Sequence, residues 1–239
     1  MKVLITICAR GGSKGITKKN IQLLNGKPLI KYSIELAIKL KSHFNCKIAI
    51  STDDDEIMNV ISNDIETKYV RPKELANDDS NKIDAIKHLI LYEENLIEDD
   101  YDYILDLDVS SPLRTLDDII KSFDIINKDS EMLSLFSVNK SIKNPYFNMV
   151  ERNILDEYFS LVKKDIRNYN SRQSAPEVFS MNAAFYWYKR DFFDQNHISP
   201  ITERTGIFEI KHICFDIDTP LDFKFIEFLI KNNELDFKL

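Results

Sequence analysis

The chain has few of the residues that build disulfide-rich, collagen-like or zinc-binding proteins: its 239 residues include 3 cysteines, 5 glycines and 4 histidines. The cysteines lie in separate apolar runs without a His or Cys at zinc spacing. They therefore exclude a disulfide framework and indicate reduced core residues, as in a cytosolic protein. The histidines show no metal spacing either, and we assign them no function. These residues are Cys8, Cys46, Cys214, His43, His88, His197 and His212.

Long apolar runs are also absent. The run Val3–Cys8 is too short for the hydrophobic part of a signal peptide, and no other run approaches the length of a membrane span. We therefore expect no membrane partner and a cytoplasmic location. Hydrophobic residues make up 44% of the chain and charged residues 30%, a globular balance, and the length suffices for one α/β domain with an excursion.

Acidic residues are missing from one part of an otherwise acidic chain. The net charge is −7, which argues against nucleic acid as a partner. From Met1 to Ile34, however, there are seven Lys or Arg residues and no Asp or Glu. This unevenness predicts that the N-terminal part binds an anion.

Three of the five glycines fall in one stretch, Ala9–Gly15, directly after the apolar run that we predict as the first buried strand. Glycine lets the backbone turn tightly and approach a ligand, and exposed amides with flanking cations suit a polyphosphate. The spacing fits neither the Walker pattern nor GxGxxG, so it indicates neither a P-loop ATPase nor a dinucleotide fold. The alternative is an ordinary strand-to-helix turn with solvated lysines.

The run from Ile7 to Ile34 resembles the N-terminal signature of the CMP-sialic acid synthetases, the acylneuraminate cytidylyltransferases. Further matches extend this resemblance over nearly the whole chain. It implies that CTP binds at the glycine-rich turn, with Lys19 stabilising the charge that grows at the α-phosphate and Asn20 orienting the nucleotide. The residues implied to hold the triphosphate are Arg10, Gly11, Gly12, Ser13 and Lys14.

Two segments bear on the nucleoside. The acids Asp53–Asp55 follow the predicted strand Lys47–Ser51; they could bind metal, but we favour a cap for the next helix, since acids suit a helix N-terminus. The segment Arg71–Asp78 resembles the family's RPxELAxD, which leads into residues that recognise cytosine. Arg71 could instead be a surface residue paired with Glu74. The family has a serine pair at Asn81-Lys82, so base recognition stays open.

A predicted strand, Tyr101–Leu107, carries two acids at its carboxyl end, where open α/β sheets place ligand chemistry. Asp106 and Asp108 share a face by strand alternation, and Asp108 is the stronger site candidate. Most sialic acid members that resemble this segment have Gln at that position, as a sugar contact. The form DLDVSSPLR resembles the branch that activates legionaminic acid. The same stretch also predicts a helix start, with Thr115 as N-cap and Asp118 completing a capping-box pattern.

The third acidic pair lies in the run Cys214–Pro220, which leads into a predicted closing helix. Asp216 and Asp218 alternate to one face of what we predict to be a strand end. Thr219 or Asp218 could also cap the helix. Magnesium prefers carboxylate oxygens together with substrate phosphates. The resemblance to the family's DIDT motif implies a Mg²⁺ site here, with Asp108 as a possible third ligand or as the group that polarises the attacking hydroxyl.

Two segments resemble the sugar-binding motifs of the family. The run Ser171–Pro176 resembles RQxxP, which implies that Arg172 holds the planar carboxylate of a sugar acid. The run Met181–Tyr186 resembles NGAIY, with Ala183 in place of the usual glycine, and implies that Asn182 and Tyr186 contact the sugar. From the residues alone, Phe185 to Tyr188 is a core strand.

Strands and helices alternate from Met1 to Ser137, which predicts a three-layer α/β/α sandwich with a mostly parallel sheet. By resemblance this is a Rossmann-like nucleotidyltransferase sheet within a single domain, 1–239. The weakly patterned segment 139–169 would be an inserted arm that packs on a second subunit in a homodimer; the alternative is an excursion with a small core of its own. The remaining predicted elements are strands Lys68–Val70 and Leu133–Val138, and helices Leu29–Leu40, Asp55–Ile61, Ile83–Leu96, Ile119–Ile126 and Leu221–Ile230.

The expected reaction is transfer of CMP from CTP to the anomeric hydroxyl of a nine-carbon sugar acid, with release of pyrophosphate. Both substrates are anions, so the basic N-terminal part and Mg²⁺ must neutralise their charge, and no covalent nucleophile is needed. The resemblance implies Lys19, Asp218 and Arg10 as catalytic residues. Legionaminic acid is the favoured sugar, with N-acetylneuraminic, pseudaminic and 3-deoxy-octulosonic acid as alternatives. A non-catalytic nucleotide-binding scaffold is the alternative from another class.

Overall fold

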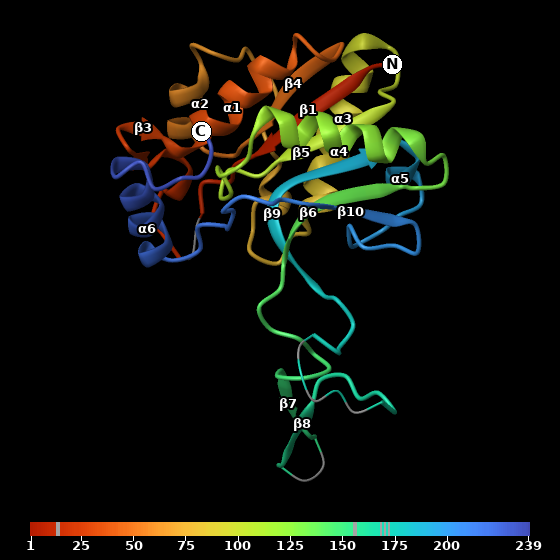
Figure 1. The fold of residues 1–239 in the computed structure, drawn as a ribbon. Coiled ribbons are helices and arrows are strands. Elements are labelled where there is room, and N and C mark those ends of the chain that lie inside the picture. The colour runs from red at the N-terminus through yellow and green to blue at the C-terminus, as the bar shows by residue number, and fades with distance from the viewer. Residues whose placement is uncertain (13–14, 155–156, 168, 170, 172) are drawn as a thin grey trace.

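A six-stranded sheet forms the centre of the molecule (Figure 1). The computed structural model describes residues 1–12, 15–154, 157–167, 169, 171 and 173–239. In the described chain the strand order is β10-β6-β9-β5-β1-β4, and β9 alone runs antiparallel to its neighbours. The strands are β1 (Val3–Cys8), β4 (Cys46–Ser51), β5 (Tyr103–Leu107), β6 (Ser134–Lys140), β9 (Phe179–Lys189) and β10 (Thr205–Glu209).

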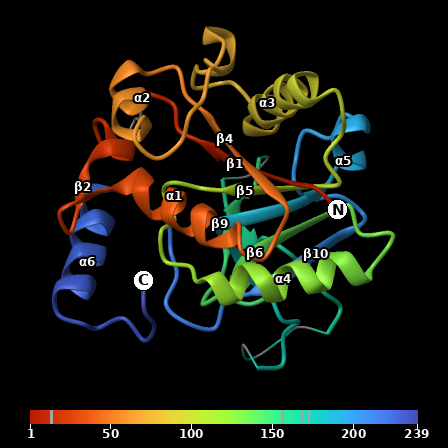
Figure 2. The same cartoon turned by 90° about the horizontal axis from the view of Figure 1, so that it is seen from above.

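Helices cover both faces of this sheet (Figure 2). Val3, Ile5 and Ile7 of β1 pack in one apolar cluster with α1 (Leu29–Leu40) and α4 (Leu116–Lys128). Leu4 points the other way, into a second cluster with α3 (Lys82–Ile97) and α5 (Asp191–Asp194). Because β1 is apolar on both faces, it can only be a central strand between two helical layers. The predicted three-layer α/β/α sandwich is confirmed.

Shorter elements complete the two layers. The helices α2 (Asp55–Ile61) and α6 (Pro220–Lys231) contribute buried apolar residues to the first cluster. Phe185 and Trp187 are fully buried in β9, so the predicted core strand is confirmed there. The remaining short elements are the 3-10 turns η1 (Lys19–Ile21) and η2 (Lys73–Leu75), and the strand pair β2 (Leu23–Leu24) and β3 (Lys27–Pro28).

The helix starts follow the polar residues that the sequence places before them. The Asp54 carboxylate accepts hydrogen bonds from the amides of Glu56 and Ile57, which confirms that the acidic run caps α2. Thr115 and Asp118 form the predicted capping box of α4. Thr219, and not Asp218, is the N-cap of α6.

Two predicted strands do not form. Lys68–Val70 makes no ladder, although the Arg71 amide after it donates to the Thr52 carbonyl at 2.8 Å. Residues 211–218 are also irregular; the Ile217 amide donates to the Ser110 carbonyl, which fixes this stretch against the loop after β5. Both segments are extended, but each is held by single backbone hydrogen bonds and not by a repeated ladder.

One residue of β9 has an unusual backbone conformation. Ala183 has φ of 54°, in the left-handed region that favours glycine. It lies where the pairing of β9 with β6 shifts register, between Phe136 and Val138. The backbone at this point therefore explains why the motif that this stretch resembles has glycine at the position.

Residues 141–178 leave the sheet between β6 and β9 and project from the rest of the molecule (Figure 1). A hairpin of β7 (Val150–Arg152) and β8 (Phe159–Leu161) forms in this excursion. Several of its apolar side chains face solvent; Phe159 is 66% exposed and Tyr158 is 74% exposed.

Candidate functional site

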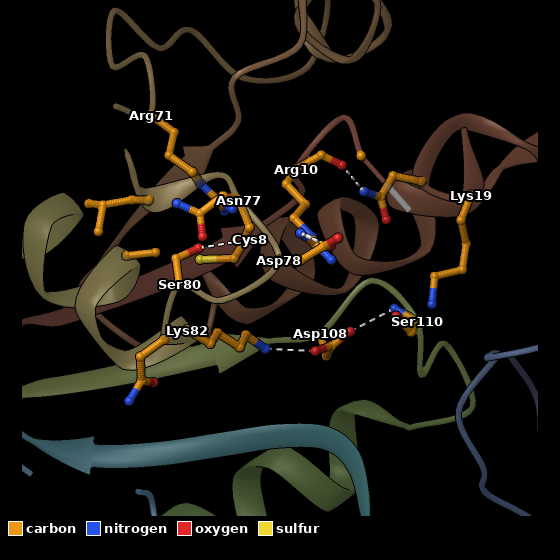
Figure 3. Close-up of a pocket in the computed structure, with 15 residues that line it drawn as sticks. Cys8, Arg10, Lys19, Arg71, Asn77, Asp78, Ser80, Lys82, Asp108 and Ser110 are labelled. Atoms are coloured by element: carbon orange, nitrogen blue, oxygen red, sulfur yellow. Dashed lines mark hydrogen bonds and ion pairs between the residues drawn. The ribbon is translucent and has the colours of Figure 1, made fainter. Parts of the chain in front are cut away.

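A polar pocket opens where β1, β4 and β5 end at their carboxyl ends (Figure 3). This is the edge of a parallel sheet where ligands bind in open α/β folds, because the loops that follow neighbouring strands meet there. Most of the predicted nucleotide-binding residues that the structure describes line this pocket. Its charged and amide side chains include Arg10, Lys19, Asn20, Arg71, Lys82 and Asp108.

Two carboxylates contact the glycine-rich turn. The Gly11 amide donates to Asp53 Oδ1 at 2.9 Å, and Arg10 Nη1 lies 2.7 Å from Asp78 Oδ1. The Asn20 amide donates to the Arg10 carbonyl at 2.9 Å, so Asn20 orients the turn. Ser13 and Lys14 lie outside the described residues.

The turn packs directly against the acidic run that contains Asp216 and Asp218. A Cβ atom built on Gly15 would collide with the carbonyl oxygen of Asp218. Lys19 Nζ donates to the Ile217 carbonyl at 2.6 Å and lies 3.8 Å from Asp218 Oδ1. The structure thus brings together the two segments that the sequence analysis expects to share a site, although they are about 200 residues apart.

Asp216 and Asp218 present carboxylates of different exposure. Asp216 is half-buried, whereas the Asp218 side chain is 72% exposed. Burial raises the pKa of Asp216, and the negative charges of Asp218 and Asp108 raise it further. This repulsion is what a bound cation would relieve, so the donor set fits a hard divalent cation.

The third expected metal ligand does not join this pair. Among the described residues, no group of three or more His, Cys, Asp or Glu side chains is arranged to hold a metal ion. Asp108 is engaged elsewhere, because its carboxylate accepts from Lys82 Nζ at 2.6 Å and from the Ser110 amide at 2.8 Å. Of the three expected metal ligands, Asp216 and Asp218 therefore remain as candidates, whereas Asp108 pairs with Lys82.

Lys82 is a site residue whose role the sequence did not reveal. Its ammonium nitrogen lies 2.6 Å from Asp106 Oδ2 and 2.6 Å from Asp108 Oδ2, as expected if both acids share a face. Burial would raise the pKa of Asp108, but the Lys82 charge and hydrogen bond lower it to about 2. Lys82 is also the first residue of α3, where the helix dipole disfavours a cation. A lysine in that position is a sign that acids lie nearby.

Arg71 is buried, with an exposed fraction of 5%, and does not pair with Glu74 as the alternative interpretation suggested. Its guanidinium donates to the Ser51 hydroxyl and carbonyl, both at 2.8 Å. The Arg71 side chain lines the pocket, with its guanidinium beside the end of β4. Arg114, which we did not predict as a site residue, is a second buried guanidinium; it donates to the Asp108 carbonyl at 2.7 Å and so fixes the loop after β5.

The expected sugar contacts are dispersed. The side chain of Asn182 is buried, with Oδ1 accepting from the Ser137 hydroxyl at 2.6 Å and Nδ2 donating to Asn139 at 2.8 Å. Tyr186 lies under Lys82, whose Nζ is 5.3 Å from the ring centroid. Arg172 lies outside the described residues.

A second depression lies at the base of the excursion and reaches Asp216. Its wall is mainly apolar, and its polar members include Asn182 and Lys140. Asp216 therefore borders this groove, while Asp218 lies near Lys19, which lines the polar pocket. The groove is lined in part by Met149, Phe179, Met181 and Phe215.

Comparison with known proteins gives consistent results. A family model described as cytidylyltransferase matches residues 4–238. The chain is 39% identical to post-translational flagellin modification protein B of Campylobacter coli, covering 99% of this chain and 98% of that protein. It is also 39% identical to the CMP-N,N'-diacetyllegionaminic acid synthase of Campylobacter jejuni, covering 98% and 97% of the two chains.

Among solved structures, the chain resembles a CMP:2-keto-3-deoxy-manno-octonic acid synthetase complexed with CTP. The TM-score is 0.70 over 98% of this chain and 100% of that one, at 17% identity. At this identity the match describes the fold.

The contact between Gly15 and Asp218 can be tested by substitution. Gly15→Ala places a methyl group against a backbone carbonyl that cannot rotate away, so we expect a loss of about 1–3 kcal/mol in unfolding free energy. Gly12→Ala is the matched control, because nothing lies within 4 Å of a Cβ built there. Urea denaturation of both variants measures the difference; equal stability of the two would contradict the packing of the turn on the acidic run.

Proposed function

Because the chain belongs to the cytidylyltransferase family, we propose that it transfers CMP from CTP to the anomeric hydroxyl of a nonulosonic acid and releases pyrophosphate. Relatives that match over nearly their whole length support this reaction, and one of them is named for diacetyllegionaminic acid. Legionaminic acid is therefore the sugar we favour. The observation that carries the proposal is the contact between the cationic turn and the acidic run, through Lys19 and Gly15.

CTP occupies the pocket at the ends of β1, β4 and β5. Its triphosphate takes over the Gly11 amide from Asp53 and the Arg10 guanidinium from Asp78. We expect Gly12, Ser13 and Lys14 to bind the phosphates as well. Arg71 borders the nucleoside side of the pocket, since its guanidinium is held by Ser51 at the end of β4.

Lys19 acts at the reacting phosphate. Its Nζ reaches the acidic run from the phosphate turn, so it lies between the two halves of the site. In the reaction the anomeric oxygen bonds to the α-phosphorus, the bond from that phosphorus to the bridging oxygen breaks, and pyrophosphate leaves. Charge grows on the phosphate oxygens, and a fixed ammonium stabilises that charge without reorganising.

Asp216 and Asp218 would hold a divalent cation, which we take to be Mg²⁺. Their carboxylate oxygens are the ligands that Mg²⁺ uses together with substrate phosphates. The ion, when bound, screens the phosphates and acidifies the attacking hydroxyl. Asp108, already held by Lys82 and Ser110, serves as an acceptor for that hydroxyl in our assignment.

The sugar acid lies on the other side of Asp216, in the groove at the base of the excursion. The apolar wall of this groove suits the acyl and deoxy groups of a legionaminic-type sugar. Arg172 would hold the sugar carboxylate through its planar fork, and Asn182 borders the groove. Tyr186 lies deeper, under Lys82, and supports the acceptor side of the site.

We also propose that the excursion, which covers all of the expected arm 139–169 except the last two residues of β6, mediates a homodimer of a single-domain enzyme. A two-stranded hairpin is marginal by itself, and this one exposes the apolar side chains of Val150 and Phe159, which suits a contact with a second subunit. No helix among the described residues is long and apolar enough to cross a membrane. The three free cysteines fit our expectation of a cytoplasmic enzyme.

The reaction is tested by pyrophosphate release from CTP with a panel of sugar acids. We expect turnover with legionaminic acid to exceed that with N-acetylneuraminic, pseudaminic and 3-deoxy-octulosonic acid. EDTA should abolish it, and Asp218→Asn should abolish it without loss of stability, because that side chain is exposed. Faster turnover with another acid would change the substrate, and no release with any acid would leave only nucleotide binding.

Lys19→Gln separates catalysis from binding. We expect kcat to fall on the order of 10²-fold, as for removal of a preorganised donor, while CTP affinity changes less. The matched control is Lys18→Gln, since Lys18 is exposed and paired with Glu56 at 2.6 Å. Steady-state kinetics and calorimetric titration of CTP measure the two effects; if both variants lose the same activity, Lys19 has no special role.

Phe159→Ser tests the dimer. The side chain is two-thirds exposed and lies on the hairpin, so its loss should weaken an interface without unfolding the sheet. Sedimentation velocity should show a shift from dimer toward monomer. Phe228→Ser on α6, where the side chain is 54% exposed, is the control. A wild-type protein that sediments as a monomer at all concentrations contradicts the assignment.

A further inference from the structure

Lys82 contacts two carboxylates at the same time, that of Asp106 in β5 and that of Asp108 just after β5. Its Nζ is 2.6 Å from Asp106 Oδ2 and 2.6 Å from Asp108 Oδ2. The Asp106 side chain is fully buried, and its other oxygen accepts from the Thr6 hydroxyl at 2.9 Å. The ammonium therefore occupies the space between two anions at the end of β5. Figure 3 shows its contact with one of them, Asp108.

The two carboxylates need a cation there. Asp106 lies in β5 and Asp108 directly follows its last residue. One of them has no access to water, so without a counter-charge their repulsion would be poorly screened. Burial disfavours the charged form of Lys82, but the charges of Asp106 and Asp108 outweigh it and raise its pKa well above the usual value. Lys82 is therefore a permanent cation in the wall of the pocket.

This cation is a poor phosphate ligand. Together, Lys82, Asp106 and Asp108 carry a formal charge of −1, so the group as a whole repels a triphosphate. Lys19 differs, because its nearest contacts are a backbone carbonyl at 2.6 Å and the exposed Asp218 at 3.8 Å. The carboxylate oxygens around Lys82 are instead the hard ligands that a divalent cation prefers.

We propose that Lys82 is a positioning residue whose ammonium fills the place of a divalent cation between Asp106 and Asp108. It holds the Asp108 carboxylate at the pocket and confines the divalent ion to Asp216 and Asp218. This inference rests on the proposed function for the place of the ion, but it assigns a role to a residue that no substrate need touch.

The contacts around Asp108 fit this role. Asp108 Oδ2 accepts a hydrogen bond from the Lys82 ammonium, and Oδ1 accepts one from the Ser110 amide at 2.8 Å. Arg114 holds the carbonyl of the same residue at 2.7 Å, so backbone and side chain are both fixed. A carboxylate held at this many points is preorganised to accept a hydrogen bond from a substrate hydroxyl.

Manganese titration of the nucleotide-free protein tests the proposal, with bound Mn²⁺ counted by the loss of the free-ion EPR signal. Lys82→Met removes the ammonium and should bind one more Mn²⁺ than the wild type. Adding Asp106→Asn to Lys82→Met should remove that extra ion. Lys87→Met is the matched control on the same helix, since Lys87 contacts Asn196 and lies outside the pocket, and it should bind as the wild type does.

A second variant keeps the test decisive if Lys82→Met does not fold. In the otherwise wild-type protein, Asp108→Asn should leave Mn²⁺ affinity within about twofold, whereas Asp218→Asn should reduce it at least tenfold. An unchanged Mn²⁺ count in folded Lys82→Met, or a tenfold loss in Asp108→Asn, would overturn the proposal. Because these readouts need neither CTP nor sugar, they are independent of pyrophosphate release, which alone decides the proposed function.

Discussion

The site depends on one contact, the packing of the glycine-rich turn against the backbone before α6. Gly15 leaves no space for a side chain at the Asp218 carbonyl, and Lys19 donates to the neighbouring Ile217 carbonyl at 2.6 Å. The N-terminal turn and the segment before α6 are thereby held together, with Lys19 Nζ 3.8 Å from Asp218 Oδ1. Cations from the first segment and carboxylates from the second then face the same space, which is what two anionic substrates require if they are to meet.

The pocket balances its charges in the absence of substrate. Asp53 accepts from the Gly11 amide, Asp78 pairs with Arg10, and Asp108 pairs with Lys82. The first two pairs involve a backbone amide and a guanidinium, the groups that we propose exchange their carboxylates for the triphosphate of the nucleotide. The third lies beside buried Asp106 and is the more permanent pair, because its separation would leave a buried charge uncompensated.

Local sequence patterns predicted much of the fold. The burial of β1 followed from its apolar run, and the caps of α2 and α4 followed from the acids 53–55 and from Thr115; for α6 the sequence left Thr219 and Asp218 open, and Thr219 is the cap. The site was less accessible, because its contacts join distant segments. Around Asp216, no local sequence pattern distinguishes an irregular stretch from a strand. The backbone hydrogen bond that fixes this stretch runs from the Ile217 amide to the distant Ser110 carbonyl. Lys82 and Asp108 are visible in the sequence as departures from the family pattern, but only the structure shows that they form an ion pair with each other.

Alanine at position 183 has a consequence for the engineering of this protein. Its φ of 54° places a side chain in a backbone region where glycine is more stable, at a difference on the order of 1 kcal/mol for L-residues. The strain lies in the strand that returns from the excursion, at the register shift beside β6. The native state therefore stores conformational energy at a known atom, Cβ of Ala183, and removal of that single methyl group is a rational first step toward a more heat-resistant catalyst.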